Sequence, residues 1–188
     1  MKAEIARVTA VLSAPDRQPP LAPMLVGLED DKAIWRVTTT TAGDVYMSMR
    51  HFKRDELYVV NCDAERFYLA WLHSGDHAIP RSAMPLDRKY ERASMGFARA
   101  CTPADPVPVA YPGVLERLDA RGFPRIAFTD GVTRTYWLLA NRAAAFPVRV
   151  WGASSAERLH QFAGLGEAPL DVKALFQQRD IDTSRPAP

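Results

Sequence analysis

Residues 125–150 have the sequence RIAFTDGVTRTYWLLANRAAAFPVRV, and their order of elements decides the fold. An apolar strand runs into a polar turn at Gly131, and a helix follows directly. Thr129 and Asp130 are both good N-cap residues, so we expect one of them to accept hydrogen bonds from the first N–H groups of that helix. A strand, a glycine turn and a helix N-terminus in this order predict a site for an anion.

Two residues of this turn suit a phosphate ligand. Gly131 allows a close approach to the backbone, and Arg134, in the first turn of the helix, adds a planar fork of donors. An ordinary capped helix with a solvated arginine is the alternative, because one glycine and one arginine form a weak motif.

Three segments carry a family resemblance. The run FTDGVTRTYWLLANRAAAFPV, residues 128–148, resembles the second signature of the ParB/sulfiredoxin superfamily, and ADPVPVA, residues 104–110, is similar to the proline-bearing strand that opens its nucleotide pocket. Together with DRKYERASMGFARA, residues 87–100, they are most similar to the plasmid fertility inhibition factors. The resemblance covers roughly residues 45–150 and rests on the order and spacing of the segments.

The chain departs from two other branches of that superfamily. Sulfiredoxins follow the glycine with Cys, His and Arg, whereas Val132, Thr133 and Arg134 stand here, so reduction of sulfinic acids is excluded. Partition proteins need a DNA-reading helical domain that is longer than the chain remaining after Val150. Centromere binding and a cytidine-nucleotide switch are therefore disfavoured.

The resemblance implies a nucleotide site with ATP as the substrate and Mg²⁺ as its metal. Asp130 and Arg134 are the expected catalytic residues, and Asp130 is the expected metal ligand. Asp130 and Thr133 each also have an alternative role. Asp130 would serve only as the helix cap, and the Thr133 hydroxyl would donate to a carbonyl oxygen within the helix. The expected nucleotide- and phosphate-binding residues are Thr129, Gly131, Thr133, Arg134 and Lys89.

Basic residues form two local clusters although the net charge of the chain is only +2. A helix over residues 87–100 places three arginines on one stripe, which suits a nucleic-acid backbone. His51 and Phe52 beside the other cluster are suited to stacking on bases. An amphipathic surface helix and a buried Phe52 are the alternatives. The expected DNA-binding residues are Arg50, Lys53, Arg54, Arg88, Arg92 and Arg99.

Composition indicates one domain of the α+β class. A chain of 188 residues that is 47% hydrophobic is long enough for one core, and mixed strand and helix patterns predict a small mixed β-sheet with surrounding helices, ParB/sulfiredoxin-like. Alternating residues over 33–41 and 44–50 predict a β-hairpin, and Asp63 is the expected N-cap of a helix whose Trp71 belongs to the core. Ser154 or Ser155 is the expected cap of a later helix. We expect an N-terminal extension over residues 1–24, the domain over 25–180 and a disordered tail over 181–188.

Further exclusions follow from the cysteines and the apolar runs. Cys62 and Cys101 lack companions at metal-ligand spacing, so we do not expect a structural zinc. We expect both cysteines to be buried, reduced thiols. No apolar run approaches the roughly 20 residues of a membrane span. We expect a cytoplasmic protein, or one held peripherally at the inner membrane through a partner.

The leading hypothesis is a plasmid-encoded inhibitor of conjugative or T-DNA transfer that hydrolyses ATP and cleaves DNA, as the family resemblance implies. The rival is a non-catalytic protein that docks on the coupling ATPase of a type IV secretion system. DNA, ATP and a coupling protein are the expected partners.

Overall fold

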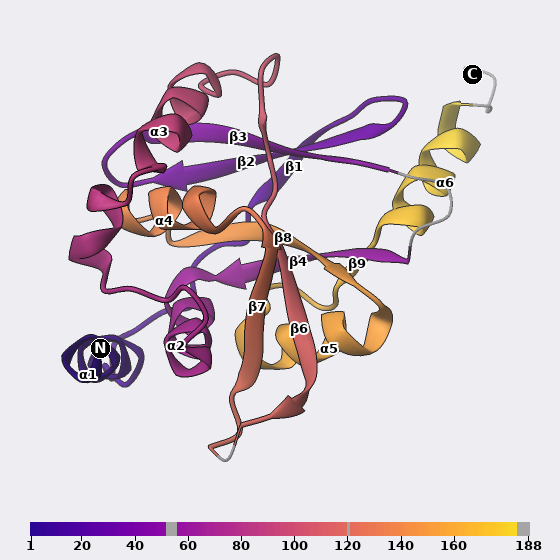
Figure 1. Ribbon diagram of the computed structural model, residues 1–188. Coiled ribbons are helices and arrows are strands. Elements are labelled where there is room, and N and C mark those ends of the chain that lie inside the picture. The colour runs from indigo at the N-terminus through magenta and orange to yellow at the C-terminus, as the bar shows by residue number, and fades with distance from the viewer. Residues whose placement is uncertain (52–55, 120, 184–188) are drawn as a thin grey trace.

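The computed structural model describes residues 1–51, 56–119 and 121–183. Its architecture is α+β, as the sequence predicts, with helices around mixed β-structure (Figure 1). The strands are β1 (Met24–Leu28), β2 (Lys32–Thr39), β3 (Gly43–Arg50), β4 (Leu57–Asp63), β5 (Val107–Pro108), β6 (Tyr111–Leu118), β7 (Pro124–Asp130), β8 (Ala145–Trp151) and β9 (Leu170–Asp171). The helices are α1 (Lys2–Leu12), α2 (Ala64–Ser74), α3 (Tyr90–Arg99), α4 (Val132–Ala140), α5 (Ala153–Ala163) and α6 (Val172–Thr183), with a 3-10 helix, η1 (Arg81–Leu86).

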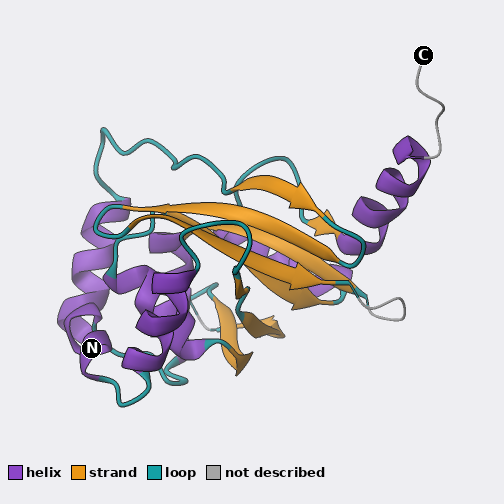
Figure 2. Ribbon diagram, turned by 90° about the horizontal axis from the view of Figure 1, so that it is seen from above, coloured by secondary structure: helices purple, strands orange, loops and turns teal. Residues whose placement is uncertain are grey.

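The strands form three sheets that meet near the middle of the molecule. One sheet has the order β1-β2-β3-β5, and β5 is its parallel member. A second has the order β8-β4-β9, and β6 pairs with β7 as an antiparallel hairpin. A parallel bridge between Ala110 and Val148 joins the chain after β5 to β8. Figure 2 shows most helices gathered at one end of the strands, while α6 extends beyond the other end.

Aromatic side chains from four elements fill the core between these sheets. Phe67 and Trp71 of α2 are fully buried. The Phe67 ring contacts Phe146 of β8 at 5.4 Å between centroids, and Trp71 lies 4.7 Å from Phe128 of β7 and 5.3 Å from Tyr136 of α4. These contacts confirm the prediction that Trp71 belongs to the core, and they anchor the strand–turn–helix segment from both sides of its turn.

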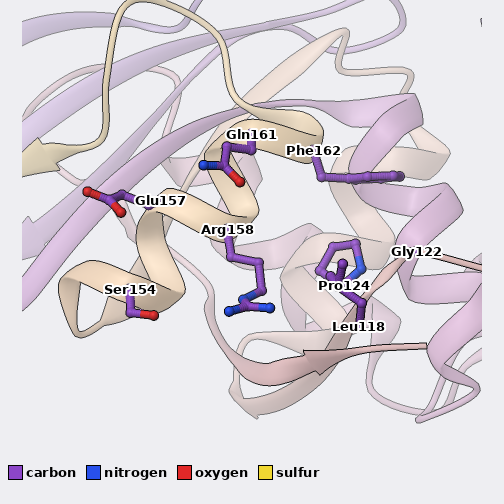
Figure 3. Close-up of a pocket in the computed structure, with 8 residues that line it drawn as sticks. All are labelled: Leu118, Gly122, Pro124, Ser154, Glu157, Arg158, Gln161 and Phe162. Carbon is purple, nitrogen blue, oxygen red and sulfur yellow. The ribbon is translucent and has the colours of Figure 1, made fainter. Parts of the chain in front are cut away.

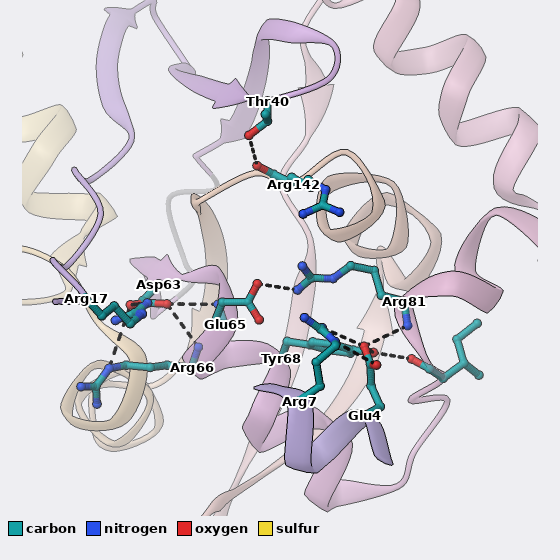
Figure 4. A network of polar contacts seen from close by, with 11 residues as sticks. Glu4, Arg7, Arg17, Thr40, Asp63, Glu65, Arg66, Tyr68, Arg81 and Arg142 are labelled. Carbon is teal, nitrogen blue, oxygen red and sulfur yellow. Dashed lines mark hydrogen bonds and ion pairs between the residues drawn. The ribbon is translucent and has the colours of Figure 1, made fainter. Parts of the chain in front are cut away.

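The N-terminal residues pack on the rest of the chain. Val8 of α1 is fully buried, and α1 lies beside α2 (Figure 1). Glu4 accepts hydrogen bonds from the Arg7 guanidinium at 2.9 and 3.1 Å, from the Tyr68 hydroxyl at 3.0 Å and from the Arg81 backbone N–H at 3.2 Å (Figure 4). The hydrogen bond from Arg7 is the main reason that the pKa of Glu4 falls to about 2, against the opposing effect of burial.

A second ion pair holds the proline-rich segment that follows α1. Arg17 donates to the Asp63 carboxylate at 2.5 Å, and that carboxylate also accepts from the backbone N–H groups of Glu65 and Arg66 (Figure 4). Asp63 is therefore the N-cap of α2, as the sequence predicts.

Several expected elements differ from the observed ones. The sequence pattern did not indicate β6, because Pro112 and Gly113 interrupt its alternation, and it did not indicate β1, β9 or η1. The second helix starts at Tyr90 instead of Asp87, since residues 87–89 form a turn in which Asp87 accepts from the Lys89 N–H at 2.9 Å.

Three further local predictions differ from the structure: the cap of α5, the burial of one cysteine and the end of the last helix. Gly152 is the N-cap of α5, and Ser155 instead donates to the Val114 carbonyl oxygen at 3.1 Å. Cys62 is buried as expected, but Cys101 is exposed. The last helix continues to Thr183, and residues 184–188 of the expected tail lie outside the described residues.

Within the described ranges, none of the helices is both long enough and apolar enough to cross a membrane.

The Glu4 cluster predicts a pH-dependent effect of Glu4→Gln. The folded-state pKa of Glu4 lies below its ordinary value, so its carboxylate stabilises the fold above about pH 4.5 and loses that effect as the pH falls towards 2. We expect the substitution to lower the free energy of unfolding at pH 7 by about 1–3 kcal/mol, the usual range for hydrogen bonds to a charged group. Urea unfolding of both proteins at pH 7 and pH 3 measures this. A difference that is as large at pH 3 as at pH 7 would contradict the assignment.

Candidate phosphate-binding site

The turn between β7 and α4 packs against the protein's own backbone. Gly131 has φ +93° and is the N-cap of α4, which has no side-chain cap. A Cβ at this position would lie 2.7 Å from both Cα and Cβ of Ala110. Glycine is therefore required here by its positive φ and by the close approach of Ala110, whether or not a ligand also approaches.

Asp130 does not cap the helix, contrary to the sequence-based expectation. Thr129 and Asp130 are the last residues of β7, and the Asp130 carboxylate accepts from Arg134 Nη2 at 2.6 Å. Partial burial would raise the pKa of Asp130, but the hydrogen bond and charge of Arg134 outweigh it and lower that pKa. Asp130 thus stays ionised near neutral pH, and it occupies one side of the arginine fork.

A cavity of about 570 Å³ opens in front of this turn. It lies between α3 and α4, which pack through the stacked rings of Phe97 and Trp137, 3.9 Å apart. Gly96 lets α3 approach β5, because a Cβ there would already touch Val107 at 3.4 Å. The lining residues are Lys89, Arg92, Ala93, Gly96, Arg99, Val107, Pro108, Phe128, Thr129, Asp130, Gly131, Val132, Thr133 and Arg134.

The cavity brings together most of the residues predicted to bind phosphate. Thr129, Gly131, Thr133 and Arg134 line it from the turn, and Lys89 lines it from the start of α3. The threonine that bonds back to the Gly131 carbonyl oxygen is Thr135, at 3.1 Å, and no such bond involves Thr133.

Two of the predicted DNA-binding arginines share this cavity. Arg92 and Arg99 line it from α3, which adds two positive charges to those of Lys89 and Arg134. Arg99 lies 3.6 Å from Asp105, but both side chains are largely exposed, so this pair neutralises the charge of Arg99 only weakly. Four cationic residues therefore line the cavity together with one carboxylate, Asp130.

The remaining predicted DNA-binding residues lie elsewhere. Arg88 precedes α3 and does not line the cavity, so the expected stripe of three arginines on one helix is wrong. Arg50, at the end of β3, also lies outside the cavity, 3.9 Å from Asp31. His51 stacks on Phe176 with 5.1 Å between ring centroids, which covers one face of its ring. Phe52, Lys53 and Arg54 lie outside the described residues.

Asp130 stands apart from other metal-binding side chains. Across residues 1–51, 56–119 and 121–183, no group of three or more His, Cys, Asp or Glu residues is placed to hold a metal ion. A carboxylate that stands alone fits Mg²⁺ when a bound nucleotide supplies phosphate oxygens as further ligands.

Arg149 is a neighbour of the site that the sequence analysis missed. Its backbone N–H donates to the Ala110 carbonyl oxygen at 3.0 Å, and its guanidinium lies 4.4 Å from the centroid of the Tyr111 ring. The charge of Arg149 contributes to the lowered pKa of Asp130. Its position as a charged residue in the otherwise apolar strand β8 is the sequence feature that could have indicated a role at the site.

Comparisons with known proteins identify the family of this chain. A model of the family described as plasmid fertility inhibition factor matches residues 59–164, a range that contains the whole turn. The chain is 32% identical to the protein osa of Shigella flexneri over 179 residues, which are 93% of this chain and 91% of that protein. This chain belongs to the plasmid fertility inhibition factor family.

A solved member of this family has the same fold. The crystal structure of the oncogenic suppression activity protein, a plasmid fertility inhibition factor studied as its gold(I) cyanide derivative, is 31% identical to this chain. The TM-score is 0.82, and the match covers 96% of this chain and 94% of the other. The family membership expected from the three sequence segments is therefore confirmed.

The close contact at the turn predicts a large effect of Gly131→Ala. A positive φ costs a non-glycine residue about 1–2 kcal/mol, and overpacking against Ala110 adds about 1–3 kcal/mol. Gly166→Ala is the matched control, because Gly166 has φ +84° and open space around its Cβ position. We expect urea unfolding to show a clearly larger loss of stability for Gly131→Ala than for Gly166→Ala. Equal losses would mean that the Ala110 contact is unimportant.

Proposed function

We propose that this fertility inhibition factor binds the phosphates of ATP and of DNA in the cavity between α3 and α4, hydrolyses ATP and cleaves DNA there, and so inhibits conjugative or T-DNA transfer. One observation carries the proposal. Lys89, Arg92, Arg99 and Arg134, from two helices, line a single cavity at the uncapped N-terminus of α4. Cations and free helix N–H groups together are the usual protein environment for phosphate oxygens.

The size and charge of the cavity suit a nucleotide. A volume of about 570 Å³ is within the range of small-molecule sites. A triphosphate brings several negative charges, and it would compete with Asp130 for Arg134. Once Arg134 turns to a phosphate, the freed Asp130 carboxylate is available to a magnesium ion that the nucleotide carries.

The same groups serve a phosphodiester. Arg92 lies in the first turn of α3 and Arg99 in the last, and both are exposed. A DNA strand that follows this helix therefore places its phosphates within reach of both. A metal ion on Asp130 would lower the pKa of a bound water and stabilise the charge of the phosphoryl transition state. ATP and DNA are then alternative substrates of one site.

A non-catalytic role is the second candidate function. In that case the protein inhibits transfer by docking on a coupling ATPase at the inner membrane, and Arg134 serves only to hold Asp130 and the first turn of α4. The 2.6 Å ion pair between the two residues is the observation that favours it, because it partly satisfies the arginine without any ligand.

The variant Arg134→Ala separates these two functions. We expect hydrolysis of ATP and cleavage of labelled single- and double-stranded DNA with Mg²⁺ to fall about 100-fold, the typical effect of removing one donor that stabilises transition-state charge. Arg125→Ala is the control, since Arg125 is an exposed arginine on β7 outside the cavity. Absence of turnover in the unchanged protein, with transfer still inhibited by Arg134→Ala in cells, would favour docking.

The variant Asp130→Asn tests the division of roles between the two residues of the ion pair. The substitution removes the negative charge that pairs with Arg134. Because an exposed ion pair is worth at most about 1 kcal/mol, ATP without metal should bind about two- to fivefold more tightly. Hydrolysis that depends on Mg²⁺ should fall at least about tenfold, because Asp130 is the only carboxylate among the described lining residues. Calorimetric titration and phosphate release measure the two effects. Unchanged hydrolysis would remove Asp130 from the chemistry.

A further inference from the structure

A second cavity, of about 350 Å³, lies between α5 and the β6–β7 hairpin. It shares no lining residue with the phosphate cavity. Helix α5 lies beside β6 in Figure 1, and Figure 3 shows the residues of both walls. These residues are Leu118, Gly122, Pro124, Ser154, Glu157, Arg158, Gln161 and Phe162.

The cavity persists because α5 is held to the hairpin at its two ends. Ser155 donates to the Val114 carbonyl oxygen at one end, and the Phe162 ring meets the Phe123 ring edge-on at 5.3 Å at the other. Between these contacts the pairing of β6 with β7 is irregular, with a register shift between Leu115 and Leu118. The walls are therefore fixed while the space between them stays open.

Arg158 is the only cationic side chain among the described residues that line the cavity. It projects from the middle of α5, and Figure 3 shows its guanidinium between Ser154 on one side and Leu118 and Pro124 on the other. Arg158 is half-buried, and its Nε is buried with no hydrogen-bond partner among the described residues. A buried donor without an acceptor is costly, so an acceptor from a ligand would stabilise this arrangement.

The surroundings of Arg158 select the chemistry of that acceptor. A guanidinium fork matches the two oxygens of a carboxylate. Glu157, the one acid among the described lining residues, is exposed, and Figure 3 shows it on the far side of α5 from the guanidinium. The described lining residues include one cation here, against four in the phosphate cavity, so this cavity suits a single negative charge better than a phosphate.

The other lining residues add an apolar wall and neutral donors. Leu118, Pro124 and Phe162 present apolar surface, and Leu118 is 49% exposed. Ser154, in the uncapped first turn of α5, and Gln161 offer donors to the same ligand. A ligand that fills the cavity therefore combines one carboxylate with an apolar group.

We infer that this second cavity binds a carboxylate carried on an apolar group, with Arg158 as the residue that recognises it. The carboxylate belongs either to a free organic acid or to an acidic residue beside an apolar one in a partner polypeptide. Both sources present the same chemistry to Arg158. The site is distinct from the phosphate cavity, because the two share none of their described lining residues.

The test is a titration of isotope-labelled protein followed by two-dimensional NMR. The probes are 4-methylpentanoate with its amide, and the capped dipeptide Leu-Glu with its Leu-Gln counterpart. We expect both carboxylates, and neither neutral partner, to shift the signals of Gly122, Ser154, Gln161 and the Arg158 Nε–H in a saturable way. Binding at least tenfold tighter by the dipeptide than by the acid would identify a polypeptide source, and the reverse order a free acid.

Two variants and one control decide the role of Arg158. Arg158→Gln should weaken binding of the better probe at least tenfold, and Leu118→Glu should do the same because its carboxylate competes for Arg158. Arg125→Gln removes the same charge from an exposed arginine on the hairpin outside the cavity and should leave binding unchanged. Three results would overturn the inference. The neutral probes shift the signals as much as the carboxylates, Arg158→Gln binds as tightly as the unchanged protein, or inorganic phosphate binds equally tightly at these residues.

Discussion

The contact between Gly131 and Ala110 is the constraint on which the arrangement of the site depends. Ala110 bridges to Val148 and accepts a hydrogen bond from the Arg149 N–H, so it is fixed by β8. Gly131 meets it where even a Cβ would not fit. This contact sets where β7 ends, where α4 begins and how the turn faces α3. The cavity in front of the turn is a consequence of that packing.

The electrostatics of the cavity follow from the same placement. Arg134 meets Asp130 because the two residues flank the fixed turn, and α3 supplies its cations from the opposite wall. The unliganded site is thus partly neutralised at the turn by Asp130 and positive on the wall that α3 forms. An incoming polyanion is attracted by the charges of α3 before it displaces Asp130 from Arg134, so its binding releases the one carboxylate among the described lining residues.

Much of the fold could be predicted where local signals were strong. Alternating residues specified the β2–β3 hairpin, Asp63 capped α2, and the glycine turn marked the passage from β7 into α4. In each of these places the residues that specify the structure are close in sequence. Lys89 lines the same cavity as the turn, as the family resemblance implied, and Arg92 lines it although it was expected in a separate DNA-binding stripe.

The failures have a common physical origin in contacts between distant residues. Asp130 was expected to cap α4, but the approach of Ala110 forces Gly131 into that place and leaves Asp130 to Arg134. Strand β6 is held by β7 and α5 despite a sequence that disfavours strands. The sequence around Arg158 does not indicate a binding site, because the opposite wall of its cavity is a hairpin some forty residues earlier in the chain.

The most direct test of a phosphate site at the β7–α4 turn is a crystal structure with Mg²⁺ and a non-hydrolysable ATP analogue. We expect the phosphates against residues 129–133, with Arg134 turned from Asp130 to a phosphate oxygen and Asp130 facing the metal. A nucleotide bound elsewhere, or an unchanged Asp130–Arg134 pair in front of an empty cavity at saturating analogue, would contradict the phosphate-binding role of this site.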